Sequence, residues 1–141
     1  MELINQYSDI VAFTIARIFL GTLFFFQGVD AVFNIKVKNI ILTSETTFLN
    51  KGIPRFLIVL GCWFTSYAEL VGGGFLILGL FQYCSLYLLG LNLIIASVAF
   101  SISTPMWDTR FVFPRLVLLL FLLVAPHSWG VFALDHLLFK N

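Results

Sequence analysis

The sequence predicts an all-α integral membrane protein folded as an antiparallel four-helix bundle. Three observations support this: four apolar runs are each long enough to cross a bilayer, turn-forming residues separate them, and charges are scarce. Of the 141 residues, 60% are hydrophobic and only 11% are charged, whereas about 25% of a soluble domain is charged. We therefore expect one membrane domain over residues 1–141, with lipid around it.

The spans are expected at residues 10–33, 53–81, 83–101 and 111–129. Pro54 and Pro114 stand near the starts of the second and fourth spans, where a missing N–H costs little because the first helical turn has no intrahelical acceptor for it. Pro126 is expected to end the fourth helix. Short links between the later spans favour antiparallel neighbours.

The first loop is the longest connection, and its segment 37–49 mixes apolar and polar residues as a helix on a membrane surface does. Basic residues gather around the first and third loops: Lys36, Lys38, Lys51, Arg55, Arg110 and Arg115. Because cytoplasmic loops carry the excess of Lys and Arg, these two loops are expected in the cytoplasm and both termini outside.

Three polar residues, Arg17, Glu69 and Asn92, fall inside the expected spans. Counting about 1.5 Å of rise per residue from the span ends puts all three at similar depth. Since an isolated charge in the bilayer is costly, we expect an Arg17–Glu69 ion pair with Asn92 beside it. Small residues near them, such as Gly21 and Gly73, favour close helix packing.

Two interpretations of this polar core stay open. In the first interpretation, the polar core is structural: a buried ion pair fixes the register of the helices while adding little net stability. Alternatively, it binds a head group, a quinone or a small anion, or it relays a proton.

A second group of charges is expected at the opposite membrane face: Asp30, Arg55, Asp108 and Arg115, with Trp107. Such residues usually anchor helices at the interface. Arg115 lies one turn into the fourth span, deep enough to need Asp30 or Asp108 as a partner.

Several common kinds of site are missing from the sequence. Cys62 and Cys84 form no CxxC pair, and His127 and His136 have no carboxylate or cysteine at ligand spacing, so we expect neither a metal site nor disulfide chemistry. No nucleotide-binding or haem-attachment motif is present, so no covalently bound cofactor is expected. The net charge of +1 gives no reason to expect nucleic acid as a partner.

Five segments are combined in this chain: ARIFLGTLFFFQGVDAVF, KGIP, AELVGGGFLILGLF, PRLVLLLFLLV and ALDHLL. Together they resemble the DoxX family of small bacterial and archaeal four-span membrane proteins. The resemblance implies a prokaryotic inner membrane. The family's recurring positions fall on Arg17, Gly21, Gly28, Glu69, Gly72, Gly73 and Asp135, whereas Asp30 stands where the family often has lysine.

The resemblance also implies a redox setting, because the family is linked to a terminal quinol oxidase, to thiosulfate:quinone oxidoreductase and to oxidative-stress complexes. We expect an accessory subunit of a quinone-linked or other redox membrane complex, assembled by helix packing with larger membrane proteins. The alternative is an oxidoreductase subunit whose polar core binds a quinone or a sulfur anion. A small-molecule transporter is less favoured, because inverted repeats and broken helices are missing. Whether the chain is itself an enzyme stays open.

Overall fold

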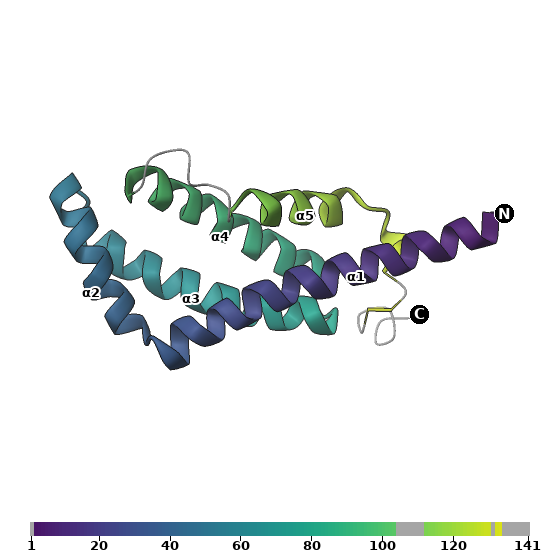
Figure 1. Cartoon of the computed structure of the whole chain (residues 1–141), viewed down its shortest axis with the longest axis horizontal. Helices are drawn as coiled ribbons and strands as arrows, with labels where there is room; N and C mark the ends of the chain where they lie inside the picture. The colour runs from purple at the N-terminus through teal and green to yellow at the C-terminus, as the bar shows by residue number, and fades with distance from the viewer. Residues whose placement is uncertain (1, 104–111, 131, 134–141) are drawn as a thin grey trace.

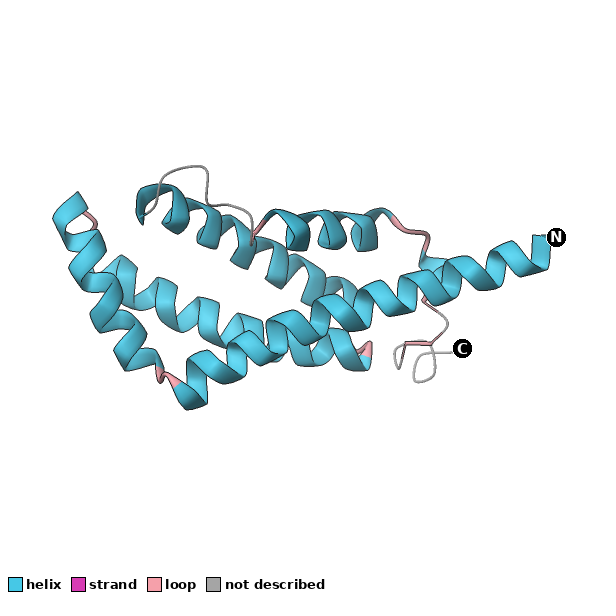
Figure 2. Ribbon diagram, in the orientation of Figure 1, coloured by secondary structure: helices cyan, strands magenta, loops and turns pink. Residues whose placement is uncertain are grey.

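The computed structural model describes residues 2–103, 112–130 and 132–133. These residues form helices joined by short turns, with no strand among them, which confirms the predicted all-α class (Figure 2). Three helical stretches are long and apolar enough to cross a membrane: Tyr7–Asn34, Arg55–Leu78 and Gln82–Ser103. Their length and composition indicate a membrane protein.

The first helix, α1, runs over Glu2–Val29 and continues as a π-helical turn, η1, over Asp30–Asn34. It therefore begins eight residues earlier than the expected span. Its first turns extend beyond the other helices (Figure 1), and from Tyr7 onward the first buried side chains are Ile10 and Phe13. The helix is thus longer than the apolar run expected from the sequence, which begins at residue 10.

The first loop folds into α2, Val37–Phe48, followed by a short 3-10 turn, η2, Leu49–Lys51. Lys36 precedes α2 with a positive φ of 67°, which turns the chain sharply after α1. The expected amphipathic segment is thus helical, and it packs along the first half of α3. Cys62 Sγ of α3 lies 3.7 Å from Ser44 Oγ of α2.

The helices α3, Arg55–Leu78, and α4, Gln82–Ser103, are joined by a tight turn. Pro54 is the N-cap of α3, as its position in the sequence predicts. Gly79 ends α3 with φ 70°, a left-handed conformation that glycine adopts without steric cost. The N–H of Leu80 then donates to the Phe75 carbonyl at 2.9 Å, which closes the end of the helix.

The last apolar helix, α5, covers only Phe113–Val124 and packs on α1 and α4. Its twelve residues span about 18 Å, well short of a hydrocarbon core of about 30 Å. Ala125 takes the extended ψ of 140° that a residue before proline prefers, so the helix stops before Pro126. A short turn, η4, His127–Trp129, follows. The helix is therefore shorter than the fourth span expected over residues 111–129.

The tightest helix contact joins α1 to α3, where glycines let the two backbones meet. A methyl group on Gly21 would lie 2.9 Å from the Ile77 backbone nitrogen, and one on Gly73 would lie 2.5 Å from the Phe25 backbone nitrogen. Gly28 faces Leu70 in the same way. The pairing of Gly21 with Ile77 and of Gly28 with Leu70 makes α1 and α3 antiparallel and fixes their register.

Candidate functional site: a polar network between the apolar helices

The carboxylate of Glu69 lies inside the protein on α3, with only 7% of the residue exposed. Its Oε1 atom accepts two hydrogen bonds, from Asn92 Nδ2 at 3.0 Å and from Gln27 Nε2 at 3.2 Å. Asn92 belongs to α4 and Gln27 to α1. The acid therefore connects the three long apolar helices at one level.

A fourth helix joins the network through Arg115, which lies in the first turn of α5. Its Nη1 atom donates to Gln27 Oε1, and its guanidinium carbon lies 5.4 Å from the centre of the Phe24 ring. Guanidinium groups are attracted to aromatic faces at this distance. Gln27 thus uses both ends of its amide, accepting from Arg115 and donating to Glu69. Each of the four apolar helices supplies one residue to this chain of hydrogen bonds.

Burial increases from Gln27 toward Asn92. Gln27 is exposed and Arg115 is half-buried, whereas Glu69 is buried and Asn92 is 0% exposed. The four polar groups therefore lead from the surface of the helix assembly to its centre. The neutral amide of Gln27 bridges the guanidinium of Arg115 to the carboxyl group of Glu69, so this buried acid is hydrogen-bonded and lies near a positive charge.

The expected Arg17–Glu69 ion pair is wrong. Arg17 is buried, but its Nη2 atom donates to the Phe132 carbonyl at 3.1 Å, and the guanidinium also lies against Gly79 at the far end of α3. The close approach of Gly28 to Leu70 sets the register of α1 on α3, and this register leaves Arg17 about 15 Å along the helix pair from Glu69. Glu69 and Asn92 come together as expected, and Arg17 does not join them.

The second expected group of charges is also divided. Arg55 pairs with Glu45 of α2, with 2.7 Å between Nε and Oε1, and Asp30 accepts a hydrogen bond from Asn34 one turn along. Arg115 turns inward to Gln27 instead of pairing with Asp30. Asp108 and Trp107 lie outside the described residues. The described residues of the expected interfacial group therefore do not lie together. Arg55 pairs with Glu45, Asp30 contacts Asn34, and Arg115 belongs to the polar network.

Gln27 is the network residue that the sequence interpretation missed. A signal for it was present, because it is the one amide in the apolar second half of the first span, within the segment LFFFQGV. An uncharged amide costs less in a membrane than a charge does, so its presence in a span does not by itself require a partner. Its position next to Gly28, where α1 meets α3 closely, brings its side chain to Glu69.

A separate depression of about 500 Å³ lies on the outer face of α3. Its lining is apolar except for Arg55: Arg55, Phe56, Val59, Leu60 and Trp63. None of the network residues contributes to it. Within the described part of the chain, no group of three His, Cys, Asp or Glu side chains is close enough to hold a metal ion.

No protein-family model, curated protein or solved structure matches this chain. The chemical possibilities of the network therefore follow from its own groups. A guanidinium and an amide near the surface can bind an anionic or carbonyl-bearing group, and a carboxylate with an amide oxygen further inside can accept hydrogen bonds.

Proposed function

We propose that this protein is an integral membrane accessory subunit of a quinone-linked or other redox membrane complex, and that it assembles with larger partners by helix packing. The observation that carries the proposal is the network of Arg115, Gln27, Glu69 and Asn92, which ties four apolar helices together through the protein's own side chains. A polar network used in this way holds a scaffold in register.

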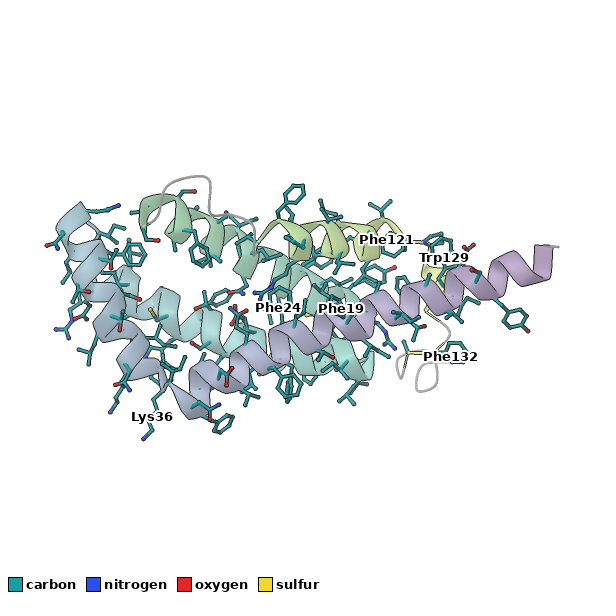
Figure 3. All side chains as sticks on the ribbon, in the orientation of Figure 1. Phe19, Phe24, Lys36, Phe121, Trp129 and Phe132 are labelled. Carbon is teal, nitrogen blue, oxygen red and sulfur yellow. The ribbon has the colours of Figure 1, made fainter. Side chains whose placement is uncertain are left out.

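The outer surface of the helices supports an assembling role. Large aromatic side chains such as Phe19, Phe121 and Phe132, labelled in Figure 3, are exposed, and further exposed phenylalanines lie on α1, α3, α4 and α5. Rigid aromatic side chains give large contact areas at low conformational cost, so they suit packing against other membrane helices as well as lipid. The redox setting rests on the resemblance of the sequence segments to the DoxX family.

The arrangement that we propose in the membrane is an antiparallel four-helix bundle, with α5 beside α1 and α4. The loop that carries α2 holds Lys36, Lys38 and Lys51, so this loop faces the cytoplasm of a prokaryotic cell and the N-terminus faces outside. The inner membrane is the setting that the family resemblance favours.

Purification in a gentle detergent tests the accessory role. Co-purification of larger membrane proteins, with a visible absorption spectrum of a redox cofactor in the same fraction, is the expected result. A stable monomer that purifies alone, together with unchanged quinone-dependent respiration in a deletion strain, would count against the role.

A second function is favoured by the way the network reaches the surface. Because Gln27 is exposed and Arg115 is half-buried, a quinone head group or a sulfur anion could meet a guanidinium at this point, with Glu69 behind it. The protein would then be the ligand-binding subunit of an oxidoreductase similar to thiosulfate:quinone oxidoreductase. If membranes that carry Glu69→Gln retain full quinone reduction, this function is excluded.

A further inference from the structure

Asn92 is the innermost residue of the network, and one of its polar atoms lacks a donor. Its Nδ2 atom donates to Glu69, but no group in the described residues donates to its Oδ1 atom, although the residue is 0% exposed. Buried amide oxygens are normally hydrogen-bonded, because an unpaired polar group in apolar surroundings is costly. An enclosed acceptor of this kind therefore needs a donor.

Turning the amide over does not remove the requirement. The reversed amide would set Oδ1 against Glu69 Oε1, so that two acceptors would face each other and the Nδ2 donor would lose its partner. The orientation of Asn92 is thus fixed by Glu69. Because Oδ1 and Nδ2 are bonded to the same carbon, the unpaired oxygen lies next to the Glu69 carboxylate, and the two together form a pair of neighbouring acceptors.

The charges around this pair determine what kind of donor fits. Arg115 already provides one positive charge near Glu69, and Gln27 bridges the two side chains. A metal cation or an ammonium group would add an unbalanced positive charge among apolar side chains. The buried leucines next to Asn92 along α4, Leu89 and Leu93, offer no polar group to such an ion. The donor should therefore be neutral, with an O–H group.

We propose that Asn92 Oδ1 and the Glu69 carboxylate form a binding site for a neutral O–H donor at the buried end of the network. Two sources share this chemistry: the hydroxyl group of a small membrane-soluble molecule, such as a phenol or an alcohol, and a buried water molecule. Water has two protons and can donate to both acceptors, whereas a hydroxyl group has one proton and donates to the unpaired Asn92 Oδ1. The site requires no redox chemistry, so it stands independently of the function proposed above.

Thermal unfolding of the purified protein in detergent tests the first source, with phenol and its methyl ether anisole as probes. Both are small aromatic molecules of similar shape, but only phenol has an O–H donor. Phenol is expected to raise the Tm and anisole is not, and Asn92→Leu is expected to abolish the response. Asn39→Leu is the matched control, because Asn39 lies exposed on α2 and its replacement should leave the response unchanged.

Nuclear magnetic resonance of the unmodified protein, labelled with ¹⁵N-asparagine, tests the second source and does not depend on whether Asn92→Leu folds. A cross-peak between water and the Asn92 side-chain amide, with the long residence time of an interior water, is expected if water is the donor. Displacement of the Asn92 side-chain signal by phenol and not by anisole supports a small-molecule hydroxyl. Equal effects of phenol and anisole, or neither a phenol effect nor a water cross-peak, would overturn the proposal.

Discussion

Gly73 of α3 lies so close to Phe25 of α1 that a single methyl group on the glycine would come within 2.5 Å of the Phe25 backbone nitrogen. Backbone atoms on both sides leave no flexible side chain to move aside. This contact, with the one between Gly28 and Leu70, fixes how α1 lies on α3. The same register decides which polar residues meet.

Replacing Gly73→Ala is expected to destabilise the protein by about 1–3 kcal/mol, the usual cost of overpacking a well-packed interior. Gly61→Ala, on the same helix, is the matched control: apart from the backbone of its own helix and its two chain neighbours, nothing lies within 4 Å of the position that its methyl group would occupy. Unfolding by SDS titration in mixed micelles measures both. Equal stability of the two variants would contradict the close contact.

Replacing Glu69→Leu is expected to cost more than Glu69→Gln. Leucine removes the acceptor of two hydrogen bonds. It leaves the buried Asn92 amide donor unpaired, at about 1–3 kcal/mol, and it also takes away the acceptor of the more exposed Gln27 amide. Glutamine keeps an oxygen that accepts from at least one of them. The same SDS titration compares the variants, and a double-mutant cycle of Glu69→Leu with Asn92→Leu should show a clear coupling energy. Additive effects would indicate that the two residues act independently.

Replacing Arg115→Met is expected to lower stability by about 1–2 kcal/mol, because it removes a charged donor to Gln27 and a cation–π contact with Phe24. Arg55→Met is the control: Arg55 pairs with Glu45, but its side chain is 72% exposed, and exposed pairs contribute about 0–1 kcal/mol. The critical result is that Arg115→Met lowers the stability more than Arg55→Met does. A larger loss for Arg55→Met would show that the network contributes less than the surface pair.

The proposed orientation predicts which side of the membrane each region reaches. In a protein carrying Cys62→Ala and Cys84→Ser, a membrane-impermeant maleimide should label Lys38→Cys only in inverted vesicles. The same reagent should label Ser8→Cys only in right-side-out vesicles. Lys38 and Ser8 are both exposed, so burial does not explain a difference in labelling. The reverse pattern would mean that the α2 loop faces outside.

Local signals made the helices of this chain predictable. Proline at position 54 and glycine at position 79 mark the ends of α3 because each acts through its own backbone, and α3 begins and ends beside them. The meeting of Glu69 with Asn92 was also predictable, since both lie near the middle of helices joined by a short turn.

The contacts of Arg17 could not be predicted from local signals, because they depend on how α1 is aligned along α3. Depth counted from the ends of apolar runs assumes that the helices start and stop together, whereas α1 extends several turns past its neighbours. The glycine contacts between α1 and α3 set the true register, and a shift of a few residues along a helix pair changes every polar contact on it. For the same reason the inward turn of Arg115 to Gln27 could not be read from spacing along the chain.

The twelve residues of α5 and the twenty-eight of α1 differ by about 24 Å in length along their axes. In the proposed membrane arrangement, α1 is long enough to cross the hydrocarbon core, whereas α5 alone is too short. Lipid beside α5 has to thin or a neighbouring protein has to cover the deficit, and each ångström of such mismatch costs a fraction of a kcal/mol. Membrane thickness would then regulate how strongly this side attracts a companion, so the protein should associate most readily in thick, well-ordered bilayers.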